Sequence, residues 1–198
     1  MPLPPAIIIA FLLILGVLLL IDILVVNYKT IAFLELLIHC LKKYTSNSFR
    51  LIICDNGSNL NEINGLKQIT KTNKNIILYQ RKQKHHPSYE HGKSLDKLIQ
   101  KVKAPYFAVF DADATILCKD WDVKLINILN QKNAYLVGSP APLGKRKFTS
   151  YFVSIFKSEV IQYKDFMFSP KIGADGKPLS NKDTGWSIEK VFKKYNLK

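Results

Sequence analysis

Short β-branched apolar runs alternate with segments of helical periodicity over most of this 198-residue chain. The runs typical of strands are residues 21–27, 49–55, 75–79, 106–110 and 134–138. Between them apolar residues recur every three or four positions, first at Ile31, Leu34, Leu37, Ile38 and Leu41. This order predicts an α/β fold with a mostly parallel central sheet and helices on both of its faces.

The regular alternation ends after Gly138. Residues 139–147 are typical of a loop, and residues 148–156 of a strand rich in aromatic and β-branched side chains. Residues 169–183 are rich in Gly, Pro and Asn, which predicts a loop before a short terminal helix. A chain of this length can bury one good core, so we expect a single domain over residues 21–198.

An uncharged apolar run, "AIIIAFLLILGVLLLI", occupies residues 6–21. At about 1.5 Å per helical residue it falls short of the roughly 30 Å of a bilayer core, so it is marginal as a span. Lysines follow it and none precedes it, which favours the cytoplasmic face of a membrane for the rest of the chain. We expect a hydrophobic helix over residues 1–20, and leave open whether it is a membrane anchor or lies on a partner.

The formal net charge is +14, which suits nucleic acid, an anionic membrane surface or a phosphorylated substrate. Only Arg50, Arg81 and Arg146 are arginines, whereas base and phosphate recognition favours arginine over lysine. We therefore expect no nucleic-acid partner. The three cysteines show no CxxC spacing, so neither a disulfide framework nor a zinc site is indicated, and we expect them to serve packing.

Polar clusters follow three of the predicted strands at their carboxyl ends, where open α/β sheets bind ligands. They are "NY" at residues 27–28, "DNGS" at residues 55–58 and "DAD" at residues 111–113. In an extended chain Asp111 and Asp113 would face the same side. Two hard oxygen ligands suit Mg²⁺ or Mn²⁺, which usually completes its shell with water and substrate phosphates.

Each cluster has a competing interpretation. A second D-x-D match, "DWD" at residues 120–122, opens a predicted helix, where capping explains acidic residues without a metal. Asp111 and Asp113 follow an apolar strand instead, so we assign the metal to them. "DNGS" is also typical of a hairpin turn, but no alternating return strand follows it. Asp55 is then left with two open roles, capping a helix or binding a nucleotide.

The segments "ILVVNYKT", "LIICDNGS" and "YFAVFDADA", in this order, resemble the GT-A glycosyltransferases of family 2 over about residues 22–130. "EHGKSLDKLI" (90–99) and "DTGW" (183–186) resemble a subset of that family. The resemblance implies the GT-A (nucleotide-diphospho-sugar transferase) fold and metal-dependent, inverting transfer of a sugar. The implied donor is a nucleotide sugar, with a UDP-sugar as the first candidate. The implied acceptor is a glycan or a lipid-linked molecule.

The resemblance also implies a role for each matching residue. Tyr28 would pack on the nucleobase, and Asp55 would hydrogen-bond it. Asp111 would reach the ribose or the metal, and Asp113 would hold Mn²⁺ or Mg²⁺ against the diphosphate. Asp183 is the first candidate for the catalytic base, although N-capping of the terminal helix explains it equally well.

Three further residues before the "DAD" strand are implicated. Glu90 is the alternative base, and His91 or Lys93 would contact the diphosphate from the start of their helix. Two other functions stay open. A nucleotidyltransferase would need a glycine-rich loop after the first strand, which "NYKTIAF" lacks. A basic, membrane-tethered binding module without enzymatic activity would show strongly salt-sensitive binding.

Overall fold

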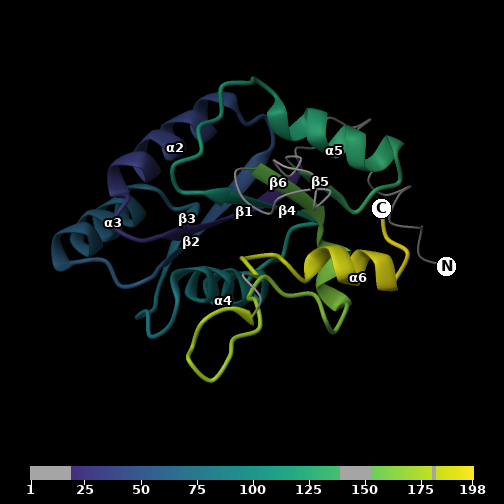
Figure 1. Cartoon of the computed structure of the whole chain (residues 1–198). Helices are drawn as coiled ribbons and strands as arrows, with labels where there is room; N and C mark the ends of the chain where they lie inside the picture. The colour runs from purple at the N-terminus through teal and green to yellow at the C-terminus, as the bar shows by residue number, and fades with distance from the viewer. Residues whose placement is uncertain (1–18, 139–152, 180–181) are drawn as a thin grey trace.

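The computed structural model describes residues 19–138, 153–179 and 182–198. Within them the strands form one sheet in the order β3-β2-β1-β4-β6-β5 (Figure 1). They are β1 (Leu20–Asn27), β2 (Ser48–Asp55), β3 (Ile76–Gln80), β4 (Tyr106–Asp111), β5 (Leu136–Gly138) and β6 (Val153–Lys157). Strands β1 to β4 are parallel, and β6 runs antiparallel to β4 and to β5. The prediction of a mostly parallel sheet is confirmed.

Helices cover both faces of this sheet, as predicted (Figure 1). One face carries α2 (Ile31–Tyr44), α3 (Leu60–Thr72) and α5 (Trp121–Gln131). The other carries α4 (Pro87–Ile99) and α6 (Ile188–Lys194), with a short 3-10 helix, η1 (Ser158–Gln162), after β6.

Side chains of β1 alternate between two hydrophobic cores. Ile21, Ile23 and Val25 belong to the core under α2 and α5. Leu24 and Val26 belong to the core over α4 and α6. Because successive side chains of a strand point to opposite faces, a strand covered on both faces must be almost wholly apolar. This burial explains why β1 lacks the polar alternation of a surface strand.

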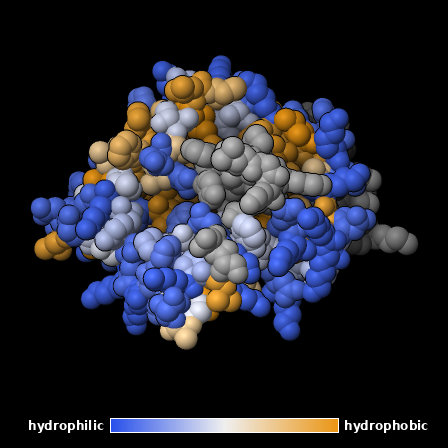
Figure 2. Space-filling model, in the orientation of Figure 1, coloured by the Kyte–Doolittle hydropathy of each residue, from blue (hydrophilic) through white to orange (hydrophobic). Residues whose placement is uncertain are grey.

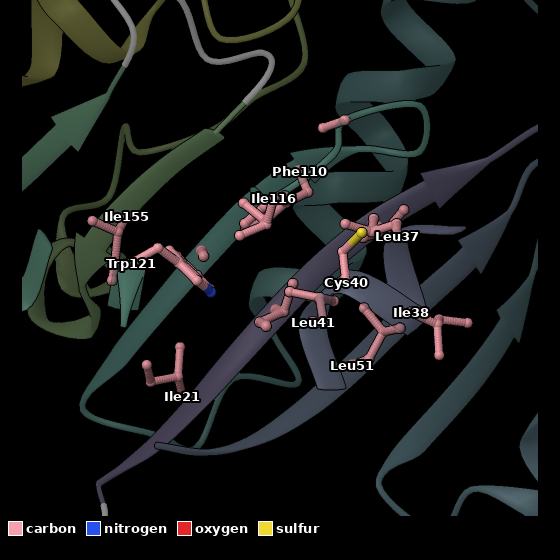
Figure 3. Packing of buried hydrophobic residues seen from close by; sticks show 14 of the residues in the cluster. Ile21, Leu37, Ile38, Cys40, Leu41, Leu51, Phe110, Ile116, Trp121 and Ile155 are labelled. Atoms are coloured by element: carbon pink, nitrogen blue, oxygen red, sulfur yellow. The ribbon is translucent and has the colours of Figure 1, made fainter. Parts of the chain in front are cut away.

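Helix α2 supplies much of the first core. Leu37 and Leu41 are fully buried, and with Cys40 they lie over β1 and β2 (Figure 3). Their spacing of three and four residues places them on one helical stripe. Trp121, at the start of α5, packs edge-on against Phe110 with ring centroids 5.2 Å apart. The two helices thereby cover the β1–β4 centre of the sheet.

Helix α3 is an element that the sequence pattern did not predict. Within it only Leu66 is fully buried, so its apolar stripe is too thin to stand out by periodicity. It begins where the side chain of Asn59 accepts a hydrogen bond from the backbone N–H of Glu62 at 3.0 Å. This N-cap stabilises a helix that packing alone specifies weakly.

Two predictions lie largely outside the described residues. They are the hydrophobic helix over residues 1–20 and the loop over residues 139–147. Leu20 already belongs to β1, and the strand predicted over residues 148–156 is described from Val153 onward. Among the helices that the structure describes, none combines the length and apolar character needed to cross a bilayer.

The cysteines divide between core and surface. Cys40 and Cys54 are buried, as a packing role predicts, and burial raises the pKa of the Cys54 thiol. Cys118 is exposed, so the packing role is wrong for this residue.

A buried ion pair closes the amino edge of the sheet. Asp22 in β1 is fully buried, and Arg50 Nε and Nη2 donate to its two carboxylate oxygens at 2.7 and 2.6 Å. The backbone N–H groups of Lys103 and Ala104 donate to Asp22 Oδ2 at 2.7 and 3.0 Å. A planar guanidinium matches a carboxylate in this two-bond geometry better than an ammonium does.

We expect Asp22→Asn to lower the free energy of unfolding by about 3 kcal/mol, because it leaves the Arg50 guanidinium without its anion. Denaturant unfolding followed by circular dichroism measures this loss. Asp165→Asn is the control, since Asp165 pairs with Lys194 on the surface and should leave the midpoint unchanged. Equal midpoints for all three proteins would contradict a bracing role for Asp22.

Candidate active site

The polar clusters after β1 and β2 form one hydrogen-bonded unit. Asp55 is fully buried, and its carboxylate accepts from Asn27 Nδ2 at 2.8 Å and from Ser58 Oγ at 2.6 Å. It also accepts from the backbone N–H groups of Gly57 and Ser58 at 3.1 and 3.0 Å. Gly57 has a φ of 93°, which favours glycine. "DNGS" is therefore a tight loop closed by Asp55, and Asn59 caps the following helix instead.

A cavity of about 560 Å³ opens beside this loop. Tyr28, Asp55 and residues 56–58 line one side, and residues 80–83, which comprise the last residue of β3 and the three after it, line the other. Tyr28 is 43% exposed, so its ring is available to a ligand. Concave sites that combine aromatic side chains with a few fixed polar groups are typical of small-molecule and cofactor sites. The structure thus brings together Tyr28 and Asp55, the two residues predicted to bind the nucleobase.

Glu90 holds the second side of this cavity in place. It is 2% exposed, and Arg81 Nη2 donates to its Oε2 at 2.7 Å. The backbone N–H groups of Lys84 and His85 donate to its Oε1 at 3.0 Å each. Burial acts to raise the pKa of Glu90, but these hydrogen bonds and the Arg81 charge outweigh it and hold the pKa below its ordinary value. The Glu90 carboxylate is therefore an ionised structural group.

A second cavity, of about 390 Å³, lies where β4 ends. It is lined by Asp111 from β4, by Ser88 and His91 from α4, and by Asp183 and Thr184, which precede α6. Segments far apart in the sequence meet here. The structure brings Asp111, His91 and Asp183 together, and Glu90 does not line this cavity.

Thr184 fixes the orientation and tautomer of His91. The Thr184 hydroxyl donates to the carbonyl oxygen of Ser88 at 2.9 Å, and His91 Nδ1 lies 3.3 Å from the same hydroxyl oxygen. Because a carbonyl oxygen only accepts, the Thr184 hydroxyl proton points to Ser88. The bond between His91 and Thr184 must then be donated by His91 Nδ1–H to Thr184 Oγ1. Burial lowers the pKa of His91 against the opposing charges of Asp111 and Asp183. His91 is therefore neutral near pH 7, with Nε2 as its acceptor.

The "DAD" segment turns instead of staying extended. The backbone N–H of Ala114 donates to the carbonyl oxygen of Asp111 at 3.0 Å, which closes a turn over residues 112–113. Asp111 is partly buried and Asp113 is exposed. The chain is therefore not extended through Asp113, as the prediction assumed, because the backbone leaves the strand after Asp111.

The donor set nevertheless suits a hard divalent cation. In the described ranges no cluster of three or more His, Cys, Asp or Glu side chains could hold a metal ion. Mg²⁺ and Mn²⁺ commonly take only one or two protein carboxylates and complete their shell with water and substrate phosphates. Asp111 and Asp113, at the carboxyl edge of the sheet, fit that pattern.

The structure removes the capping alternative for Asp183. Helix α6 begins at Ile188, and its N-terminal flanking residue is Ser187. Asp183 instead accepts from the backbone N–H of Thr184 at 2.7 Å, in the turn that precedes the helix. Lys93, predicted to bind diphosphate, is exposed and its Nζ lies 5.7 Å from the ring centroid of Tyr89. The structure brings Lys93 to neither cavity.

The capping interpretation of "DWD" is also wrong. Asp120 makes no side-chain cap hydrogen bond, and it accepts from the Ser46 hydroxyl instead. Asp122 is fully buried and accepts from the backbone N–H groups of Ser46 and Asn47 at 3.1 and 2.8 Å. Both acids therefore hold the loop between α2 and β2, so this D-x-D match is structural.

The sequence matches the model of the glycosyl transferase family 2 over residues 22–178. The chain belongs to glycosyl transferase family 2. No curated protein matches its sequence. The family match agrees with the resemblance carried by "ILVVNYKT", "LIICDNGS" and "YFAVFDADA".

Solved structures share the fold of this family 2 chain. Mannosyltransferase PcManGT from Pyrobaculum calidifontis, in complex with GDP-Man and Mn²⁺, aligns with a TM-score of 0.62 at 14% identity, over 79% of this chain and 49% of that one. S. aureus TarS 1–349 aligns with a TM-score of 0.56 at 13% identity, over 75% and 50%. A complex of TarS 1–349 with UDP aligns with a TM-score of 0.54. The chain spans about half the length of these proteins. The similarity confirms the predicted GT-A fold.

Four polar residues of this family 2 site were not predicted from the sequence. They are Asn56, Arg81, Ser94 and Thr184. Arg81 Nη1 donates to Ser94 Oγ at 2.8 Å, and the Ser94 hydroxyl donates to Asn56 Oδ1. Arg81 could have been found, because a rare arginine follows the carboxyl end of a strand, where the other clusters lie. Asn56, Ser94 and Thr184 lie within the motifs "DNGS", "EHGKSLDKLI" and "DTGW", but their roles depend on partners distant in sequence.

Gly92 lets α4 lie directly against the segment that leads to Asp183. A Cβ at Gly92 would lie 2.4 Å from the Cα of Ser169 and 2.8 Å from the carbonyl oxygen of Phe168. Asp96, one turn further along, accepts from the backbone N–H of Phe168 at 2.6 Å. Close backbone packing is therefore the physical reason for glycine at this position.

We expect Gly92→Ala to destabilise this family 2 chain by about 2 kcal/mol, because the atoms that the new methyl group meets are backbone and cannot rotate away. Thermal or denaturant unfolding measures the loss. Lys93→Ala is the neighbouring control, and its exposed side chain predicts a change within about 0.5 kcal/mol. Gly92→Ala with wild-type stability would contradict the close approach of α4 to residues 168–169.

Proposed function

We propose that this family 2 chain is a metal-dependent glycosyltransferase that moves a sugar from a nucleotide-sugar donor to an acceptor hydroxyl with inversion. One observation carries the proposal. Asp111 and Asp183, distant in sequence, line one cavity at the same sheet edge as the cavity lined by Tyr28 and Asp55. A nucleotide site and a carboxylate pair at one edge are what such a transfer needs.

The donor would bind with its base in the first cavity. Tyr28 offers a ring for stacking, Asp55 keeps the "DNGS" loop closed, and Lys82 places positive charge beside it. The complexes of PcManGT with GDP-Man and of TarS with UDP support a nucleotide donor. Among donors we expect a UDP-sugar.

Asp183 would act as the base for the acceptor. It takes the proton from the acceptor hydroxyl as that oxygen bonds to the anomeric carbon and the bond from that carbon to the diphosphate breaks. The products are a glycoside and a nucleoside diphosphate. A divalent ion held by Asp111 and Asp113 would offset the charge of this leaving group. Asp183 is favoured over Glu90, whose carboxylate is already held by Arg81 and two backbone N–H groups.

A third cavity, of about 490 Å³, supports a separate approach for the acceptor. It shares Ser88 and Asp183 with the catalytic cavity and continues to His86, Lys177 and Lys182. An acceptor bound there would reach Asp183 from a cavity that Asp111 does not line. We propose that this acceptor is either a glycan or a lipid-linked molecule.

Association with the cytoplasmic face of a membrane is part of the proposal. The net charge of +14 favours anionic lipid. On α2, Phe33 and Leu36 are 55% and 48% exposed, and Figure 2 shows hydrophobic side chains gathered over this helix above a mostly hydrophilic lower face. Apolar side chains beside basic ones suit a lipid–water interface.

Incubation of the chain with UDP- and GDP-sugars and Mn²⁺ tests this function. We expect Asp183→Asn to reduce sugar release or transfer by about 100-fold or more, because it removes the base but leaves the nucleotide cavity intact. Asp113→Ala should abolish the Mn²⁺ dependence of nucleoside diphosphate binding.

Asp165→Asn is the matched control, since Asp165 lies on the surface by Lys194 and should leave both readouts unchanged. Wild-type protein that neither binds nor cleaves any common nucleotide sugar would contradict the proposed function. Full activity of Asp183→Asn would contradict the assignment of the base.

A further inference from the structure

We propose that Glu90 is a positioning residue for the nucleotide: through Arg81 and residues 84–85 it holds one side of the donor cavity and ties that side to α4. The inference rests on the proposed function, because it takes the ligand of that cavity to be a nucleotide. It gives Glu90 a role other than that of the alternative base.

The segment after β3 depends on Glu90 for its shape. Residues 81–84 form neither helix nor strand. The backbone N–H groups of Lys84 and His85 both donate to Glu90 Oε1 at 3.0 Å. A carboxylate oxygen that accepts two successive backbone N–H groups fixes the direction of the chain there. Residues 80–83, which line the cavity, lie directly before these two bonds.

Arg81 joins the two sides of the cavity. Its backbone N–H donates to the carbonyl oxygen of Asp55 at 2.7 Å. Its guanidinium donates to Glu90 Oε2 at 2.7 Å and to Ser94 Oγ at 2.8 Å. The Ser94 hydroxyl then donates to Asn56, in the "DNGS" loop. These hydrogen bonds form a closed circuit that links the segment after β3, helix α4 and the "DNGS" loop. A displacement of α4 would therefore displace both sides of the cavity.

Helix α4 also reaches the catalytic cavity. Glu90 and Ser94, one turn apart, face the circuit, while Ser88 and His91 line the cavity that holds Asp111 and Asp183. One rigid helix therefore sets where the nucleotide lies relative to the reacting groups. Loss of Glu90 should weaken donor binding first and the chemical step less, because the groups around Asp183 keep their own contacts.

Glu90→Gln tests this role, because it keeps the length of the side chain and turns an acceptor oxygen into a donor facing N–H groups. We expect the Kd for UDP or GDP with Mn²⁺, measured by calorimetry, to rise about ten-fold or more. The donor KM should rise by a similar factor while kcat changes less than about three-fold. Ser94→Ala removes both hydrogen bonds of the Ser94 hydroxyl but leaves the Glu90–Arg81 pair and the bonds to residues 84–85, so it should weaken binding by a smaller factor and serves if Glu90→Gln does not fold.

Asp22→Asn is the matched control at the opposite edge of the sheet. Asp22 and Glu90 are 0% and 2% exposed, and their arginine partners are 22% and 23% exposed. Both variants should lose stability, but only Glu90→Gln should lose nucleotide affinity. Unchanged or tighter binding by Glu90→Gln and Ser94→Ala, or an equal loss in Asp22→Asn, would overturn the inference. Wild-type protein that binds no nucleotide would contradict the proposed function instead.

Discussion

The contacts of α4 are the constraint on which the site depends. On one side Glu90 accepts from Arg81 and from the loop after β3. On another, Gly92 lies against the backbone of Ser169. At its first turn, the Ser88 carbonyl accepts from Thr184. A side chain with a Cβ at position 92 would separate these elements, so a single glycine and a single buried carboxylate hold together segments from β2, β3 and the C-terminal part of the chain.

Two arginine–carboxylate pairs, each with a buried carboxylate, lie at opposite edges of the sheet. We expect one of them to serve stability alone and the other to serve the site as well. The Arg50–Asp22 pair lies at the amino edge, far from every strand-end cluster. The Arg81–Glu90 pair lies at the carboxyl edge, beside the cavity proposed to bind the nucleotide. Arginine is scarce in this chain, and both described arginines are used where one planar group must donate several hydrogen bonds: Arg50 to the two oxygens of Asp22, and Arg81 to Glu90 and Ser94. None of the described lysines is buried.

The sequence predicted the parallel sheet and the location of the site, because burial on both faces leaves apolar strands and ligands bind beyond their carboxyl ends. Tyr28, Asp55 and Asp111 were predicted from the strand ends, and His91 and Asp183 from the family resemblance; the structure places all five around cavities at this edge. Helix α3 was missed because its stability comes from Asn59 and tertiary packing. The turn after Asp111 and the partners of Asp122 were missed because they depend on contacts between segments distant in sequence. Such contacts leave no local pattern.

A crystal structure with a nucleoside diphosphate and Mn²⁺ bound tests the account most directly. We expect the base to lie against Tyr28, between the "DNGS" loop and residues 80–83, with the diphosphate directed toward Asp111 and Mn²⁺ on its carboxylate. A nucleotide bound elsewhere, for example in the groove between β5 and α6, or a metal remote from Asp111, would contradict it.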